Sequence, residues 1–190
     1  MAGGRRGVMR GYSAIGIVNS KTEANVGGAM RAAACYGAST VIVEGARYKP
    51  NAADVTKAWR HIPLFHVDDL WKMMPYDCVP VAIEFIKDAR PLPSFTHPER
   101  AFYIFGPEDG NIPDRILSRC KNVVMIPTQR CMNLASTVNV VLYDRLVKRT
   151  SKQSTYADHT VPDLELQTNA IFNEDQLLAD PERTGSLEVA

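Results

Sequence analysis

Residues 102–113 read Phe-Tyr-Ile-Phe-Gly-Pro-Glu-Asp-Gly-Asn-Ile-Pro, an apolar run that passes into a turn rich in glycine and acid. The run 102–105 is typical of a buried β-strand, and Gly106 marks its end. Because ligands bind at the carboxyl ends of strands in parallel sheets, the turn is a candidate cofactor site that includes Glu108. The alternative is an ordinary surface turn with Glu108 in water.

The same kind of strand recurs along the first 150 residues, in alternation with segments of helical period. This alternation predicts an α/β fold, a mostly parallel sheet flanked by helices. The expected strands are residues 14–18, 40–43, 64–67, 79–85, 102–105 and 123–126. The expected helices are residues 24–36, 51–59, 68–73, 112–119 and 133–148. Residues 86–100 contain three prolines, so we expect a loop there with no helix.

Two further segments combine polar residues with a predicted helix start. Residues 25–31, Asn-Val-Gly-Gly-Ala-Met-Arg, open the helix that Gly37 should end. They do not match GxGxxG or a P-loop, so they indicate either an anion site or tight helix packing with Arg31 in solvent. Residues 126–133, Ile-Pro-Thr-Gln-Arg-Cys-Met-Asn, lead into the last helix, which Asn133 should cap. Cys131 lacks an adjacent histidine, which favours a half-buried small residue over a nucleophile.

The charge of the chain is divided unevenly. The whole chain of 190 residues has 22 Lys+Arg and 21 Asp+Glu, a net charge of +1 that argues against a polyanionic partner. From Ser151 onward, however, there are two basic and eight acidic residues, which leaves a net charge of +7 on residues 1–150. We expect one domain in residues 1–150 and an acidic, largely disordered tail in residues 151–190. The tail could alternatively fold over the basic face or bind a partner.

Other function classes find little support in the sequence. The composition, 45% hydrophobic and 23% charged, is that of a globular domain. The four cysteines are widely spaced and form no CxxC pair, so neither a disulfide framework nor a metal site is expected. No apolar run approaches the length that spans a bilayer, and no signal peptide is visible. A cytoplasmic location is the expectation, with no membrane or metal partner.

Taken together, the three segments resemble the motifs of the SpoU (TrmH-type) family of RNA ribose 2'-O-methyltransferases, in the SPOUT superfamily. The first motif corresponds to residues 25–31, the second to residues 104–108, and the third to Ile126-Pro127 with residues 132–136. The resemblance runs from about residue 12 to residue 149. One departure is Cys131, where the family usually has serine, and a thiol is the poorer hydrogen-bond partner.

The resemblance implies a C-terminal trefoil knot that forms an S-adenosylmethionine pocket, and a homodimer with active sites at the subunit interface. It implies methyl transfer to a ribose 2'-hydroxyl of RNA. Since no separate RNA-binding domain is visible before the expected catalytic one, we expect a small structured RNA such as tRNA more than rRNA. The catalytic residues would be Asn25, Arg31, Glu108 and Asn133. The cofactor would be bound by Gly106, Pro107, Ile126, Cys131, Met132 and Leu134.

The basic surface then has a use, since phosphates provide most of the sequence-independent affinity for RNA. The candidate phosphate contacts are Arg5, Arg6, Arg10, Lys21, Arg47, Lys49, Arg60 and Arg130. Two alternatives stay open. One is an RNA-binding protein of the same fold that has lost methyl transfer, which Cys131 would explain. The other is a small-molecule α/β enzyme that binds a nucleotide at its glycine-rich turns.

Overall fold

The computed structural model describes residues 11–47 and 62–153, with side chains to residue 149. The strands are β1 (Tyr12–Val18), β2 (Val41–Glu44), β3 (Leu64–Val67), β4 (Val79–Ile83), β5 (Arg90–Pro91), β6 (Arg100–Phe105) and β7 (Asn122–Met125). The α-helices are α1 (Glu23–Tyr36), α2 (Asp114–Leu117) and α3 (Leu134–Gln153), and two 3-10 helices are η2 (Leu70–Met73) and η3 (Leu92–Ser94). The helix predicted for residues 51–59 lies outside the described residues. The disordered tail was predicted for residues 151–190, but residues 151–153 continue α3, and residues 154–190 lie outside the described residues.

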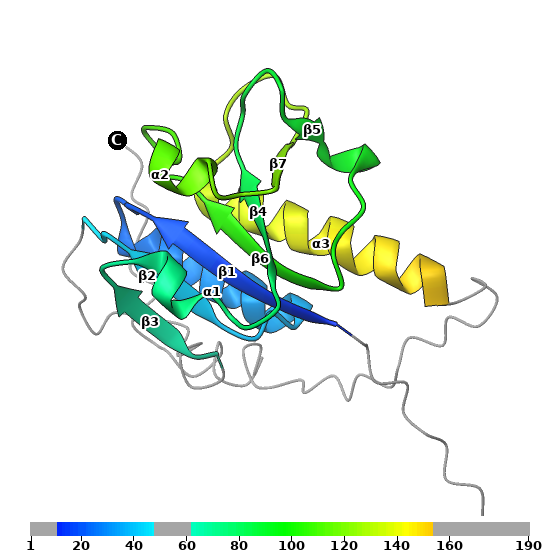
Figure 1. Cartoon of the computed structure of the whole chain (residues 1–190), viewed down its shortest axis with the longest axis horizontal. Helices are drawn as coiled ribbons and strands as arrows, with labels where there is room; N and C mark the ends of the chain where they lie inside the picture. Colours follow the sequence, from blue (N-terminus) through cyan, green and yellow to red (C-terminus); the bar gives the residue numbers. More distant parts are fainter. Residues whose placement is uncertain (1–10, 48–61, 154–190) are drawn as a thin grey trace, which may run out of the picture. The chain divides into compact units, whose positions relative to one another are not determined.

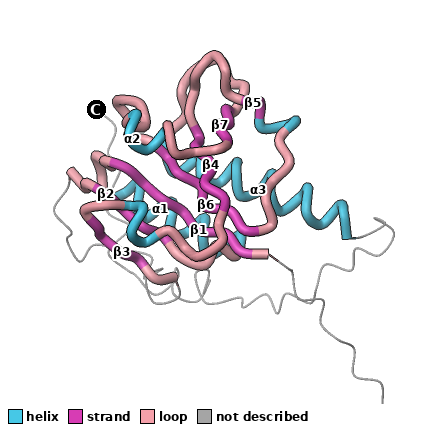
Figure 2. The backbone as a smooth tube through the Cα atoms, in the orientation of Figure 1, coloured by secondary structure: helices cyan, strands magenta, loops and turns pink. Residues whose placement is uncertain are grey.

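The strands form one parallel sheet in the order β3-β2-β1-β6-β4-β7-β5 (Figures 1 and 2). Its centre is the pair β1 and β6, in which Ile15 is opposite Tyr103 and Ile17 is opposite Phe105. All four of these side chains are buried, as expected for strands covered on both faces. The α/β prediction with a mostly parallel sheet is therefore confirmed.

The two faces of the sheet have different covers. On one face, Ile15, Ile17 and Phe105 belong to the same apolar cluster as residues of α1 and α3, and Figure 1 shows both helices behind the sheet. On the other face, Phe102 and Ile104 pack with residues of η2, α2 and the loops beside them. The long helices α1 and α3 thus cover one face, and the short helices η2 and α2 cover the other. The carboxyl ends of the strands are lined mainly by loops.

Helices α1 and α3 approach each other closely at their amino-terminal ends. A Cβ on Gly28 of α1 would lie 2.6 Å from the Cβ of Ala135 in α3, so only glycine permits this approach. Gly37 ends α1 in the left-handed conformation (φ 71°), as predicted. The predicted apolar face of α3 is confirmed, because Leu134, Val138, Val141 and Leu142 are buried in the core. The approach brings residues 25–31 next to the start of α3.

A buried polar network fixes α3 to the other end of the sheet. Arg145, only 6% exposed, donates hydrogen bonds to the carbonyls of Tyr12, Pro98 and Glu99. His97 lies 2.6 Å from the hydroxyl of Tyr103 and 2.8 Å from Asp144. Burial raises the pKa of Tyr103 to about 12 and lowers that of His97, so both are neutral in this network at neutral pH.

Several predicted elements differ from the structure. Residues 86–100, predicted as a loop with no helix, contain η3 and the two-residue strand β5, which no periodicity could reveal in so short a span. The predicted helices 68–73 and 112–119 shrink to η2 and α2. The predicted strand 79–85 ends at Ile83, and the Glu84 side chain accepts the backbone N–H groups of Phe85 and of the distant Ile112. Within the described ranges, no helix is both long and apolar enough to cross a bilayer.

Candidate functional site

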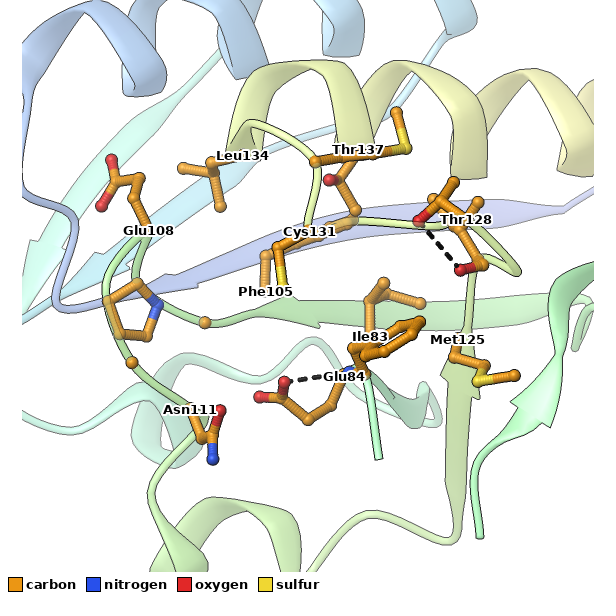
Figure 3. Close-up of a pocket in the computed structure, with 16 residues that line it drawn as sticks. Ile83, Glu84, Phe105, Glu108, Asn111, Met125, Thr128, Cys131, Leu134 and Thr137 are labelled. Carbon is orange, nitrogen blue, oxygen red and sulfur yellow. Dashed lines mark hydrogen bonds between the residues drawn. The ribbon is translucent and has the colours of Figure 1, made fainter. Parts of the chain in front are cut away.

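A pocket lies where β4, β6 and β7 end and their following loops meet the start of α3 (Figure 3). Parallel strands bring their carboxyl ends to one edge, so three segments far apart in sequence converge there. The pocket is lined by Ile83, Glu84, Phe85, Phe105, Gly106, Pro107, Glu108, Gly110, Asn111, Met125, Ile126, Thr128, Cys131, Met132, Leu134 and Thr137. All six residues predicted to bind a cofactor are in this set, so the structure brings them together.

The shape of the pocket depends on the turn after β6. A Cβ on Gly106 would lie 3.0 Å from the Ile112 Cγ1 atom and 3.2 Å from the Ile112 backbone nitrogen. The turn thus folds back so tightly that a side chain at this position would push Ile112 away. Apolar side chains line the pocket together with several polar ones, among them Glu84, Glu108 and Asn111, a combination found in small-molecule sites.

Three of the four predicted catalytic residues form a continuous hydrogen-bonded chain beside the pocket. The Asn25 side-chain amide donates to Glu108, and the Asn133 amide donates to Asn25 Oδ1 at 2.8 Å. These residues come from α1, from the turn after β6 and from the start of α3. The three motifs of the sequence are therefore joined in one cluster.

Glu108 is held by further donors from the loop after β1. Its carboxylate accepts the Lys21 backbone N–H at 3.0 Å and the Ser20 hydroxyl at 3.3 Å. Partial burial alone would raise the pKa of Glu108, but the hydrogen bonds from Asn25, Lys21 and Ser20 outweigh it and lower the pKa below its ordinary value. Glu108 is thus an ionised acceptor that orients its partners, and it is poorly suited to donate a proton.

Asn133 performs two tasks with one side chain. Its Oδ1 atom accepts the backbone N–H groups of Ala135 at 2.9 Å and Ser136 at 3.3 Å, which confirms the predicted helix cap. Its amide nitrogen is then directed to Asn25. The cap fixes the amide, so the cluster is anchored to the end of α3.

Arg31 stands apart from this cluster. Its side chain is exposed on α1, and it is not among the residues that line the pocket. Six residues along a helix correspond to a rotation of about 120° from Asn25, so the two side chains leave different faces of α1. A single chain therefore does not bring the predicted catalytic arginine to the pocket.

Charged residues gather at the rim of the pocket. Arg47 forms a two-point contact with Asp109, at 2.5 and 3.1 Å, and Lys21 Nζ lies 3.7 Å from the same carboxylate. Arg47 also lies 4.0 Å from Glu108. Arg47, above all through its hydrogen bonds, lowers the pKa of Asp109. Lys21 and Arg47, two predicted phosphate contacts, thus flank the cluster of Asn25, Glu108 and Asn133.

The remaining predictions about basic residues and cysteine are resolved only in part. Arg130 is exposed, while Arg5, Arg6, Arg10, Lys49 and Arg60 lie outside the described residues.

Cys131 is exposed at the mouth of the pocket, because the loop after β7 runs over the surface before α3 begins. The prediction that this residue is half-buried is therefore wrong. Among the described residues, no group of three or more His, Cys, Asp and Glu is placed to hold a metal ion.

Sequence reasoning missed four polar residues of the pocket, namely Glu84, Asn111, Thr128 and Thr137. Glu84 could have been found: it is the first charged residue after an apolar run, where parallel strands present ligand groups. The predicted strand extended past it to residue 85 and hid this position. Asn111 and Thr128 lie inside the two loop segments that the sequence had singled out, but nothing distinguished them from their neighbours there. Thr137 lies on the flank of α3, where the sequence gives no signal.

The comparisons with known proteins agree with this geometry. The model of the SpoU rRNA Methylase family matches residues 13–143. The chain therefore belongs to this family, whose members are S-adenosylmethionine-dependent RNA methyltransferases, and the resemblance of the motifs is confirmed. No curated protein sequence matches the chain.

Solved structures share the fold at low identity. The SpoU methyltransferase AviRb from Streptomyces viridochromogenes has a TM-score of 0.67 at 19% identity over 74% of this chain and 61% of its own. AviRb has also been solved with the cofactor AdoMet, with a TM-score of 0.66, 20% identity and coverage of 76% and 63%. A structure concerned with 2-OH methylation of C/U34 on tRNA has a TM-score of 0.65, 22% identity and coverage of 75% and 99%. The chain spans about six tenths of AviRb but nearly all of the tRNA-related protein.

Proposed function

We propose that this chain methylates a ribose 2'-hydroxyl of structured RNA, with tRNA favoured over rRNA and S-adenosylmethionine as the methyl donor. The observation that carries the proposal is the hydrogen-bonded chain Asn133–Asn25–Glu108 beside the pocket at the strand ends. It joins the residues of all three family motifs, as a working site requires. The domain in residues 1–150 would carry this activity, with residues 151–190 as an acidic tail.

The residues of the pocket fit the cofactor. Apolar side chains of Ile126, Met132 and Leu134 suit an adenosyl group, and Gly106 lines the same pocket without a side chain to obstruct it. The cofactor supplies an activated methyl group on a sulfonium, so the protein has only to position the two reactants and assist loss of a proton. A trefoil knot formed by the chain after β7 is part of this proposal.

The polar cluster would orient the ribose rather than act as the base. Glu108 accepts hydrogen bonds and fixes Asn25, whose position in turn fixes the amide of Asn133. Arg31 would grip an RNA phosphate and stabilise the developing negative charge on the 2'-oxygen, since a guanidinium stays protonated at ordinary pH. The hydroxyl requirement selects RNA, because DNA lacks the 2'-hydroxyl.

A homodimer would explain the exposed position of Arg31. If a second copy completes the site, an arginine that leaves α1 away from its own pocket could reach the pocket of the partner. The exposed aromatic ring of Tyr143 on α3, packed edge to face against Tyr36 on α1, offers apolar surface on the same helix layer for such contact. Dimerisation and the catalytic role of Arg31 are therefore proposed together.

A catalytically impaired RNA-binding protein is the second candidate, and Cys131 favours it. This thiol lines the pocket where the family usually has serine, and it is a weaker hydrogen-bond partner. The intact cluster of Asn25, Glu108 and Asn133 favours the enzyme.

Two measurements test the proposal. Calorimetry should show that the purified chain binds S-adenosylmethionine. Incubation with cofactor carrying a labelled methyl group, together with total tRNA or with rRNA, should label RNA at one nucleotide that resists alkaline hydrolysis of its 3' phosphodiester. Cofactor binding without transfer to either RNA would leave the impaired RNA-binding protein as the better account. No cofactor binding would refute the assignment of the pocket.

A further inference from the structure

Glu84 occupies a distinctive place in the pocket. It follows β4 directly, and its backbone N–H donates to the carbonyl of Val124 at 3.0 Å, so its own main chain is still tied to β7. Its side chain lines the pocket, as Figure 3 shows. Glu84 belongs to none of the three motif segments.

The carboxylate of Glu84 is fixed at both oxygens. Oε1 accepts the backbone N–H of Phe85 at 2.9 Å, and Oε2 accepts the backbone N–H of Ile112 at 2.7 Å. Ile112 ends the turn that folds back against Gly106. The bond from Ile112 therefore ties this turn to the end of β4, and it holds the charge of Glu84 at a defined position on the wall.

The charges on the pocket wall have one sign. Among the described lining residues, the ionisable acids are Glu84 and Glu108, and no lysine or arginine is present. Arg47, which lies 4.0 Å from Glu108, is engaged by Asp109 at the rim. Apolar neighbours such as Ile83 and Phe105 limit screening by water, so the two carboxylates make the pocket favour positive charge.

This charge matters for the two forms of the cofactor. S-adenosylmethionine carries a sulfonium, an ammonium and a carboxylate, a net charge of +1. Methyl transfer would break the methyl–sulfur bond with its electron pair left on sulfur, form a carbon–oxygen bond at the 2'-oxygen, and release the hydroxyl proton to water. The product, S-adenosylhomocysteine, is then a neutral thioether with net charge zero. A negatively charged wall attracts the cationic S-adenosylmethionine more than the neutral S-adenosylhomocysteine.

We infer that Glu84 is a specificity-determining residue, which makes the pocket prefer the sulfonium cofactor over its thioether product. The inference rests on the proposed cofactor pocket. As a consequence, the product S-adenosylhomocysteine binds more weakly than S-adenosylmethionine, so a fresh cofactor molecule displaces it from the pocket after each reaction. Glu108 lies 4.0 Å from Arg47, which offsets part of its charge, whereas within the described residues Glu84 accepts two backbone N–H groups and forms no ion pair. Glu84 is therefore the carboxylate whose charge is least offset at the pocket wall.

Calorimetric titration of the full chain tests this with three probes: S-adenosylmethionine, S-adenosylhomocysteine, and sinefungin, in which an amine carries the positive charge and no methyl can be transferred. The variant is Glu84→Gln, which removes the charge but keeps the size. The matched control is Asp88→Asn, which removes a negative charge from the exposed loop after β4, away from the pocket lining. Thermal unfolding of both variants shows that they are folded.

In Glu84→Gln, affinity for the sulfonium cofactor and for sinefungin should fall about three- to tenfold, while affinity for the thioether changes less than twofold. Asp88→Asn should leave all three affinities unchanged. Equal losses for charged and neutral ligands would overturn the inference, because they would mean that Glu84 only braces the turn at Ile112. Unchanged affinities in Glu84→Gln would overturn it as well. Failure of the unmutated chain to bind any of the probes would instead refute the proposed function.

Discussion

The side-chain amide of Asn133 donates to Asn25 Oδ1 at 2.8 Å, although 108 residues separate the two along the chain. Two features of the packing create this contact. The cap of α3 fixes the Asn133 side chain, and Gly28 lets α1 approach α3 at Ala135. The contact links the first and third motifs, so a change at Asn25 reaches both Glu108 and the end of α3.

Replacement of Asn25 by alanine should therefore impair catalysis more than stability. The Asn25→Ala variant leaves Glu108 and Asn133 without their shared partner, and we expect methyl transfer to fall about a hundredfold or more. The free energy of unfolding should fall by only about 1 kcal/mol, since the cluster is partly exposed. Asn139→Ala is the matched control, because Asn139 only donates to the Ala135 carbonyl within α3. Loss of cofactor affinity by the same hundredfold would contradict the assigned role.

Removal of the Asp109 charge should strengthen binding of RNA. Asp109 neutralises Arg47 and Lys21 at the pocket rim, so Asp109→Asn frees two cations for phosphates. We expect RNA affinity to rise several-fold at low salt and its dependence on salt to steepen, since more counterions are displaced. Filter binding across a salt series measures both quantities. The same affinity and slope in Asp109→Asn and in the parent chain would exclude Arg47 and Lys21 as phosphate contacts.

The sequence predicted the parallel sheet and the two long helices, because these depend on local periodicity. For the six residues expected to bind the cofactor, which line one pocket in the structure, the sequence offered only the resemblance of its motifs to a family. It could not predict the contact of Asn133 with Asn25, which needs the close approach of two helices, or the brace between Glu84 and Ile112, which needs the folded turn. Single side-chain contacts between distant loops leave no periodic signal.

The pH dependence of stability should reflect the lowered pKa of Glu108. Because the folded pKa lies below the unfolded one, the ionised carboxylate stabilises the fold above the unfolded value of about 4.3. This contribution is lost as the pH falls through the folded pKa. The difference in unfolding free energy between the parent chain and Glu108→Gln should be constant from pH 8 to about pH 5 and shrink below about pH 4. Chemical denaturation at each pH measures it, and a difference that grows towards acid would contradict the sign.

Arg145 should be important for stability but not for chemistry. Its guanidinium is buried and satisfies the carbonyls of Tyr12, Pro98 and Glu99, which would be left without these donors in Arg145→Ala. We expect the free energy of unfolding to fall by about 3 kcal/mol or more. The exposed Arg31 provides the control, because Arg31→Ala should change the free energy of unfolding by less than about 0.5 kcal/mol. Similar losses in the two variants, measured by chemical denaturation, would argue against the anchoring role.

The catalytic role proposed for Arg31 yields the sharpest test, because its side chain does not line the pocket of its own chain. Arg31→Ala should abolish methyl transfer and leave cofactor affinity nearly unchanged. Glu108→Gln should also be inactive, because it damages the cluster. If Arg31 serves the pocket of a partner copy, mixing these two variants under conditions that exchange subunits restores about a quarter of the activity, since half of the dimers are mixed and each holds one intact site. If Arg31 serves its own pocket, no mixed dimer contains an intact site, and the mixture stays inactive.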